Sequence, residues 1–176
     1  MLELSILDFI QTLRNSLWDY LMVTISTLGD HGQVWILIAL VLVALKNKKD
    51  RWCGVHILLA LAANILIVNM CLKPWISRVR PFTFRPDLIL LVQLPKDGSF
   101  PSGHTSSSFA AATAIYLYNK KWGMLALVFA GFMGISRMYL YVHYPTDVAA
   151  GAVIGIAEAL LAENVIKLFQ QDPKPM

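Results

Sequence analysis

The sequence predicts an all-α protein, a bundle of membrane-spanning helices. Of its 176 residues 57% are hydrophobic, and the mean hydropathy is +0.58, whereas soluble domains are usually about 45–50% apolar. The apolar residues gather in long uncharged runs, and a membrane span needs roughly 20 such residues. The length allows five or six spans and leaves no room for a separate soluble domain. We therefore expect one integral membrane domain over residues 1–176.

Six apolar segments are assigned as spans. Turns or charged residues separate them, for example Asp30-His31-Gly32 after the first and residues 46–51 after the second. The connection over residues 73–102 is much longer than the others. In the last segment, Gly151 and Gly155 predict close helix packing within one chain. The predicted spans are residues 16–29, 34–45, 52–72, 103–118, 122–135 and 145–166.

The segment before these spans has a different pattern. Within residues 2–14, apolar side chains recur at helical spacing, with polar residues such as Glu3 and Asp8 between them. This pattern predicts an amphipathic helix that lies in the membrane interface. The start of the first span is an equally good interpretation.

The basic residues favour one orientation in the membrane. The positive-inside rule places the basic connections after the second and fourth spans in the cytoplasm, together with the C-terminal tail. Both termini are then predicted to be cytoplasmic, with residues 73–102 and 137–145 on the extracytoplasmic face. The residues that set this orientation are Lys46, Lys48, Lys49, Arg51, Lys120, Lys121, Lys167 and Lys174.

Other features limit the function. The N-terminus has no basic region before an apolar core, so we do not expect a cleaved signal peptide. The net charge is +4, but no basic arm or basic-aromatic stripe indicates a nucleic-acid partner. Cys53 and Cys71 fall near opposite ends of one predicted span, about 27 Å apart at a rise of about 1.5 Å per residue, which is too far for a disulfide.

A stretch at the start of the fourth predicted span indicates an anion site. In Pro101-Ser102-Gly103-His104 the proline and glycine predict a chain break followed by a helix start. The N-terminus of a helix presents free N–H groups and the positive end of the macrodipole, which favour an anion. His104 would place a protonatable group beside that anion. Because Pro-Ser-Gly is also common as a plain helix cap, the interpretation depends on the other segments.

Cations gather at the same predicted face. Lys73 and Arg80 share a face if their segment is helical, and Arg137 follows the fifth span. Arginine offers a planar fork to phosphate oxygens and lysine a point charge. Three cations beside a helix N-terminus can therefore neutralise a phosphate dianion and the charge that develops during its transfer. Snorkelling to lipid headgroups explains Arg85 and Lys96.

His143 and Asp147 complete this group. Pro145 disfavours a helical Tyr144, so His143 is predicted to lie just before the sixth span and Asp147 in its first turn. The carboxylate of Asp147 can accept the Nδ1–H of His143 and leave Nε2 free to attack phosphorus. His104 can then protonate the leaving oxygen and later deprotonate the attacking water.

Together these motifs resemble those of a known family. Lys-x6-Arg-Pro at 73–81, Pro-Ser-Gly-His at 101–104 and Ser-Arg-x5-His-x3-Asp at 136–147 occur in this order without a missing residue. They are similar to the signature of the type 2 phosphatidic acid phosphatase superfamily, which includes lipid phosphate phosphatases and vanadium haloperoxidases. The resemblance implies a six-span membrane enzyme that works through a phosphohistidine, without a metal or other cofactor. It implies that His104 is the acid–base residue, His143 the nucleophile and Asp147 its orienting partner, and that phosphate is bound by Lys73, Arg80, Ser102, Gly103 and Arg137.

The resemblance also implies a substrate class and a location. Small bacterial members without a soluble domain often dephosphorylate undecaprenyl diphosphate, while others act on phosphatidylglycerophosphate or phosphatidic acid. We therefore expect a multi-pass protein of the bacterial cytoplasmic membrane, with its site on the extracytoplasmic face. Its expected partners are the lipid bilayer and a lipid phosphate. The motifs contact the phosphate and not the lipid, so the substrate alternatives stay open.

Two rival functions stay open as well. His104, His143 and Asp147 can also be ligands of a catalytic metal ion, and a lipid transporter or scramblase can use basic residues as a gate for headgroups. Glu158, within the sixth predicted span, is interpreted as a protonated or hydrogen-bonded interior residue instead of a proton carrier. Arg78, outside the fixed motif positions, is a candidate for contact with a second phosphate.

Overall fold

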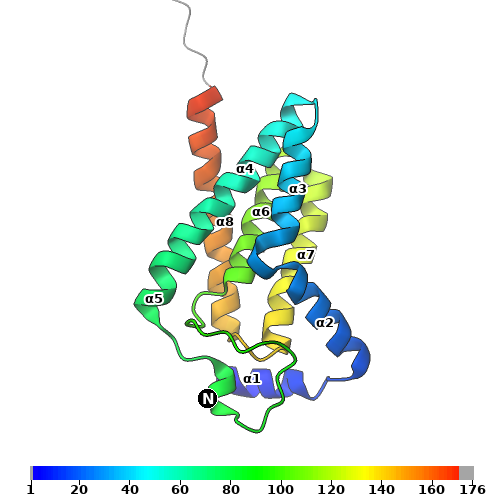
Figure 1. Ribbon diagram of the computed structural model, residues 1–176, viewed down its shortest axis with the longest axis vertical. Helices are drawn as coiled ribbons and strands as arrows, with labels where there is room; N and C mark the ends of the chain where they lie inside the picture. Colours follow the sequence, from blue (N-terminus) through cyan, green and yellow to red (C-terminus); the bar gives the residue numbers. More distant parts are fainter. Residues whose placement is uncertain (1, 171–176) are drawn as a thin grey trace, which may run out of the picture.

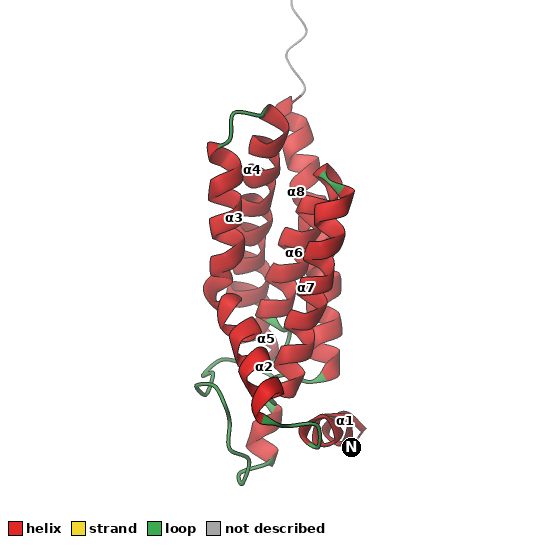
Figure 2. Ribbon diagram, turned by 90° about the vertical axis from the view of Figure 1, so that its right-hand side faces the viewer, coloured by secondary structure: helices red, strands yellow, loops and turns green. Residues whose placement is uncertain are grey.

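The computed structural model describes residues 2–170, and this part of the chain contains helices and loops but no strand (Figure 1). Most of the helices form an elongated bundle, and α1 lies across one end of it, as Figure 2 also shows. The prediction of an all-helical fold is confirmed. The helices are α1 (Leu2–Gln11), α2 (Ser16–Leu28), η1 (Asp30–Gly32), α3 (Gln33–Ala44), α4 (Lys48–Asn64), η2 (Ile65–Leu72), α5 (Lys73–Ile76), η3 (Pro81–Phe84), α6 (Gly103–Tyr118), α7 (Lys120–Tyr139) and α8 (Pro145–Gln170).

The number of spans differs from the prediction. Among the described residues, three helical segments are long and apolar enough to cross a membrane: Lys48–Phe84, Lys120–Tyr139 and Pro145–Phe169. α2 and α3 make a fourth candidate if the bent pair is counted as one span. α6, which we predicted as a span, has 16 residues, fewer than the roughly 17–25 that a span needs. The six-span prediction is therefore not confirmed.

A break between α2 and α3 explains part of this difference. His31 and Gly32 have φ angles of 54° and 69°, a conformation that glycine adopts without strain. The two helices are bent by 49° at this point and continue in one general direction (Figure 1). The turn predicted at residues 30–32 is thus a kink in a broken helix and does not reverse the chain between two spans.

α1 is a separate helix at the end of the bundle. It ends at Gln11, and the Asn15 side chain caps α2 by accepting hydrogen bonds from the backbone of Leu17 and Trp18. Of the two interpretations of residues 2–14, the structure therefore favours the separate helix. Because α2 and α3 run on in one direction, the described ends of the chain, in α1 and α8, lie at opposite ends of the bundle (Figure 1). Which side of the membrane each end faces stays a prediction.

The helix α4 continues through the π-helical segment η2 into α5. This long helix contains the predicted span 52–72 and carries Lys73 to the end of the bundle where α1 lies. π-Helical turns often mark functional sites, because they shift the register of the side chains that follow. Cys53 and Cys71 are both free, as predicted.

α6 packs against α4, α7 and α8 in the centre of the bundle. A Cβ atom added at Gly155 would meet the backbone oxygen of Ser106 at 2.1 Å, and one at Gly151 would meet that of Ser102 at 2.7 Å. Only glycine allows this approach of α8 to α6. The Gly-x-x-x-Gly pattern is confirmed as a packing seam within the chain.

Candidate active site

One cavity at the α1 end of the bundle contains both predicted catalytic histidines and three predicted phosphate-binding cations. Its volume is about 610 Å³. Segments that are far apart in the sequence line it: α2, the kink before α3, the start of α5, the loop before α6 and the end of α7. The charged and titratable residues in its lining are Asp30, His31, Lys73, Arg80, Asp97, His104, Arg137 and His143.

Asp97 pairs with two of these cations. Its carboxylate accepts hydrogen bonds from Lys73 Nζ and from Arg80 Nη2, the latter at 2.7 Å. Burial acts to raise the pKa of Asp97, but the contacts with Lys73 and Arg80 outweigh it and lower the pKa to about 2. Arg80 Nη1 also donates to the backbone oxygen of Val142 at 2.8 Å, so the guanidinium is held from two sides. We did not predict a role for Asp97; its place in a basic loop four residues before Pro101 was the available signal.

Arg137 is the third cation of the cavity and is 5% exposed. Its Nη1 donates to Ser26 Oγ, and its Nε has no hydrogen-bond partner within the described residues. A buried donor without an acceptor is costly. An anion in the cavity would supply the missing acceptor, which supports the interpretation of Arg137 as a phosphate ligand.

His104 lies in the first turn of α6, as predicted. Its Nε2 is 2.8 Å from Asp30 Oδ1, at the kink between α2 and α3. A carboxylate partner fixes the orientation and the tautomer of an imidazole. Sequence reasoning treated Asp30 only as a turn residue. A lone acid between two apolar runs, at the predicted depth of the site, was the signal that could have identified it.

His143 lies just before α8 and Asp147 in its first turn, as predicted, but the contact between them is looser than expected. His143 Nδ1 is 3.5 Å from Asp147 Oδ2 and has no hydrogen-bond partner in the described part of the chain. Asp147 instead accepts hydrogen bonds from Tyr144 N at 2.9 Å and from Arg78 Nη1 at 2.6 Å. Burial lowers the pKa of His143 to about 3, so its imidazole is neutral at pH 7. Nε2, 3.3 Å from Arg80 Nη1, faces the cationic group.

The structure does not bring Ser102 into the cavity. Its side chain is the N-cap of α6, 2.9 Å from Thr105 Oγ1, and its backbone N–H donates to Asp147 O at 3.1 Å. Gly103 lines an adjoining cavity of about 390 Å³ that also includes Lys73, Asp97 and His104. Ser102 therefore fixes α6 to α8, whereas Gly103 is close to the cations.

Arg78 lies away from the main cavity. Its Nη2 donates to Glu3 Oε2 at 2.6 Å, and its Nη1 donates to Asp147 Oδ1 and Thr146 Oγ1. Both Nη atoms are thus occupied by acceptors of the protein itself. The expectation that Arg78 contacts a second phosphate does not agree with this arrangement.

Comparison with known proteins gives the family. A model described as "PAP2 superfamily" matches residues 54–171. The chain belongs to the PAP2 superfamily. The resemblance inferred from the three motifs is therefore confirmed. Among residues 2–170 of this PAP2 chain, no three His, Cys, Asp or Glu side chains are grouped so that they could hold a metal ion.

Individual relatives carry different names. The bacitracin transport permease protein BcrC of Bacillus licheniformis is 46% identical over 84 residues, which are 48% of this PAP2 chain and 41% of the relative. An undecaprenyl-diphosphatase of Sulfolobus acidocaldarius is 32% identical over 129 residues, 73% of this chain and 62% of the relative. The matches thus span less than two thirds of both relatives.

The fold also agrees with that of a solved PAP2 structure. The crystal structure of a transmembrane PAP2 type phosphatidylglycerolphosphate phosphatase from Bacillus subtilis matches with a TM-score of 0.75 and 26% identity. The match covers 97% of this chain and 87% of the other. The membrane-protein fold predicted from the hydrophobic runs is thus found in a relative of similar length.

Proposed function

We propose that this PAP2 protein is a membrane lipid phosphatase that removes the terminal phosphate of undecaprenyl diphosphate. The observation that carries the proposal is the single cavity in which two imidazoles, of His104 and His143, lie with three cations. The name of the Sulfolobus relative supports the substrate. Phosphatidylglycerophosphate, which the name of the Bacillus subtilis phosphatase supports, and phosphatidic acid are the alternative substrates.

In the first step the terminal phosphate displaces the Asp97 carboxylate from Lys73 and Arg80 and accepts a hydrogen bond from Arg137 Nε. His143 Nε2 then attacks phosphorus. An N–P bond forms while the bond between phosphorus and the bridging oxygen breaks, and His104 gives its proton to that oxygen. The lipid monophosphate leaves, and the transferred phosphoryl group stays on His143.

In the second step water removes the phosphoryl group. His104, now neutral, accepts a proton from a water molecule whose oxygen attacks phosphorus. The N–P bond breaks, its electron pair returns to His143, and inorganic phosphate is released. Asp147 stabilises the imidazole of His143 while it carries positive charge. The three cations stabilise the negative charge that gathers on the equatorial oxygens.

The adjoining cavity supports a lateral route for the lipid tail. It meets the main cavity at Lys73 and His104, and it is lined farther along by Ile36, Leu61 and Ile65 of α3, α4 and η2. A tail in this cavity would remain among apolar side chains while the headgroup reaches the cations. We further propose that the basic end of the bundle, with residues 46–51 and 119–121, is cytoplasmic. The site and the N-terminus would then both be extracytoplasmic.

The test is phosphate release by the purified protein from undecaprenyl diphosphate, phosphatidylglycerophosphate and phosphatidic acid, compared at equal detergent ratios. We expect release to be fastest from undecaprenyl diphosphate and to be lost in His143→Ala. His56→Gln, which changes a buried histidine that contacts Ala159 O and not the cavity, is the matched control. Lipid movement without phosphate release would favour the transporter, which the name of the Bacillus licheniformis relative also suggests. Loss of activity in a chelator, restored by a metal ion, would favour the metal-dependent hydrolase.

A further inference from the structure

We infer that α1 is part of the support of the active site, and that Glu3 and Arg78 are positioning residues for Asp147. The inference rests on the proposed function, in which Asp147 stabilises His143. It gives a role to the N-terminal helix beyond that of an interfacial anchor. It also gives a role to Arg78, which the three motifs do not include.

A continuous chain of ion pairs connects α1 to Asp147. Glu3 Oε2 accepts a hydrogen bond from Arg78 Nη2 at 2.6 Å, and Arg78 Nη1 donates to Asp147 Oδ1 at 2.6 Å. The Arg78 guanidinium also stacks over the ring of Tyr144 at 3.9 Å. Contacts on several sides leave Arg78 little freedom, so its Nη1 defines where one oxygen of the Asp147 carboxylate lies.

Glu3 also binds the start of α8 directly. Its Oε1 accepts hydrogen bonds from Thr146 Oγ1 at 2.6 Å and from Thr146 N at 3.3 Å. The first N–H groups of a helix have no partner within the helix, so a carboxylate from α1 caps the first turn of α8, the turn that contains Asp147. Loss of Glu3 would loosen both Arg78 and the helix that carries Asp147.

The burial of Asp147 makes this support important. The Asp147 side chain is fully buried, and a buried carboxylate without a cation is strongly disfavoured. Arg78 is the arginine that contacts it. Since His143 Nδ1 is 3.5 Å from Asp147 Oδ2, a small movement of the carboxylate decides whether the hydrogen bond to His143 forms.

α1 offers a matched control in a second ion pair. Asp8 Oδ2 accepts a hydrogen bond from Arg85 Nη2 at 2.5 Å, and this pair is more exposed than that of Glu3. Arg85→Gln removes one contact between α1 and the loop but leaves the hydrogen bond from Tyr141 to Asp8. This variant tests whether the loss of any ion pair of α1 lowers kcat, or only the loss of the pair that connects α1 to Asp147 through Arg78.

The experiment compares kcat and KM for phosphate release in Arg78→Gln, Arg78→Lys, Glu3→Gln and Arg85→Gln. We expect kcat of Arg78→Gln to fall about 10–100-fold, by analogy with the loss of residues that orient the ligands of a metal site, with KM unchanged. The kcat of Glu3→Gln should decrease less than that of Arg78→Gln. Arg78→Lys should regain part of the lost kcat, and Arg85→Gln should have the wild-type kcat and KM. Equal kcat values for Arg78→Gln and Arg85→Gln would overturn the inference, as would a rise in KM of Arg78→Gln with kcat unchanged.

The same assay separates this inference from the proposed function. Phosphate release by the wild-type protein and its loss in His143→Ala decide whether the chain is a phosphatase of the proposed kind. The ratio of the kcat of Arg78→Gln to that of Arg85→Gln decides the role of α1. Thermal unfolding identifies variants that fail to fold. If Arg78→Gln does not fold, the kcat of Arg78→Lys is compared with that of Arg85→Gln instead. A lower kcat of Arg78→Lys supports the inference, and equal values overturn it.

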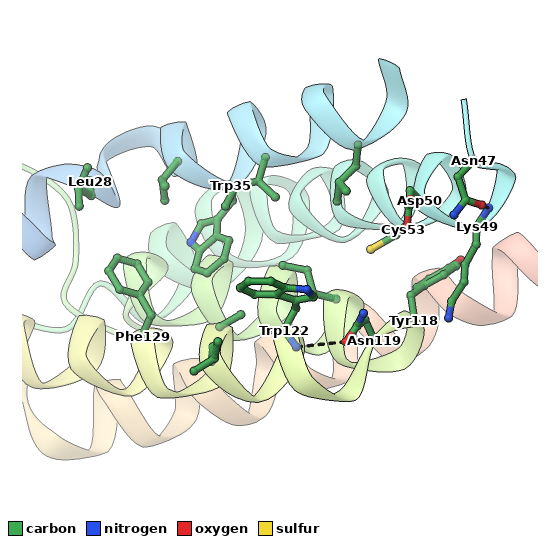
Figure 3. A pocket seen from close by; sticks show the side chains of 16 residues that line it. Leu28, Trp35, Asn47, Lys49, Asp50, Cys53, Tyr118, Asn119, Trp122 and Phe129 are labelled. Carbon is green, nitrogen blue, oxygen red and sulfur yellow. Dashed lines mark hydrogen bonds between the residues drawn. The ribbon is translucent and has the colours of Figure 1, made fainter. Parts of the chain in front are cut away.

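A different observation carries a second proposal. Between α3 and α7 runs an apolar groove of about 690 Å³, which Figure 3 shows from Leu28 near the kink to Asn47 at the far end. Side chains at helical spacing face each other across it. They are Val34, Trp35, Ile38 and Leu42 on α3, and Trp122, Leu125, Ala126 and Phe129 on α7.

We propose that this groove binds one acyl chain of an anionic phospholipid. Trp122 and Leu125, which line the groove on α7, are themselves exposed, so hydrocarbon chains of the bilayer can reach it from the side. Its far end is lined by Asn47, Lys49, Asp50 and Asn119. The neighbouring residues Lys46, Lys48, Arg51, Lys120 and Lys121 make this end strongly basic, which complements an anionic headgroup.

Native mass spectrometry of the purified protein with added phosphatidylglycerol or phosphatidylcholine tests this site. We expect one phosphatidylglycerol to be retained in preference to phosphatidylcholine, and Ala126→Trp, which fills the groove, to lose it. Val128→Trp, on the same helix outside the groove lining, is the matched control and should retain it. Equal retention by Ala126→Trp and Val128→Trp would overturn the proposal. A dimer that is broken by Ala126→Trp would overturn it in favour of a second copy of the chain.

Discussion

The contact between Asp30 and His104 gives a direct test of the acid–base role. Asp30→Asn keeps the shape of the side chain and removes its charge. A hydrogen bond to a charged group contributes about 1.5–3 kcal/mol, but the Asp30 side chain is 46% exposed, so we reduce this to about 1–2 kcal/mol for solvent screening. That energy corresponds to a decrease in kcat of about 5–30-fold. KM should be unchanged, because Lys73, Arg80 and Arg137 still bind the phosphate.

The assay is the initial rate of phosphate release from undecaprenyl diphosphate, with Asp87→Asn as the matched control. Asp87 lies exposed in the loop before α6 and does not line the cavity, so its loss should leave both constants unchanged. The reasoning is refuted if Asp30→Asn and Asp87→Asn have the same kcat. An increase in KM alone would mean that Asp30 acts on substrate binding and not through His104.

Three further outcomes are expected. Lys73→Met should weaken inhibition by orthovanadate about tenfold or more, measured by inhibition constants, because a charge-assisted contact is lost. Glu158→Ala should lower the free energy of unfolding by about 1–3 kcal/mol, measured by denaturant unfolding, because two buried donors lose their acceptor; Glu158→Gln should lower it less. Acidification should release α1, measured by limited proteolysis. Burial acts to raise the pKa of Glu3, but hydrogen bonds lower it below 4.5, and hydrogen bonds lower that of Asp8 below 3.8. A group whose pKa is lowered in the folded state contributes stability above its unfolded-state pKa, and this stability is lost as the pH falls through the folded-state pKa. α1 should therefore be protected at pH 6 and become progressively more open to cleavage as the pH falls below the unfolded-state values of these two groups.

The sequence was sufficient to predict that five of the motif residues meet, although it also included Ser102, which does not line the cavity. Lys73, Arg80, His104, Arg137 and His143 all line one cavity, although they come from three helices, α5, α6 and α7, and from two separate loops. Short motifs made this possible because they fix local geometry. A proline and a glycine before His104 set the start of α6, and Pro145 set the start of α8.

The sequence alone did not identify the acids that complete the site. Asp30 lies in a turn, Asp97 in a loop and Glu3 in an amphipathic helix, and each has an ordinary pattern around it. Their importance comes from contacts over 74, 24 and 75 positions in the chain, with His104, Lys73 and Arg78. The predicted span count was not confirmed for a related reason, since hydropathy measures the length of an apolar run but not whether the chain reverses after it.

The two irregular segments of the bundle, the kink at residues 30–32 and η2, each help to place a charged side chain of the site. The kink after α2 frees Asp30 from the helix and directs its carboxylate to His104, while the π-helical segment η2 precedes Lys73, which is buried although Met70 and Cys71 just before it are exposed. A regular helix at either place would cost less in backbone hydrogen bonds, because breaks leave N–H and C=O groups without helical partners. Both breaks instead line the adjoining cavity, which meets the main cavity at Lys73 and His104. The departures from regular helix thus gather where charged side chains must face inward, which is the pattern expected when local stability is given up to build a site.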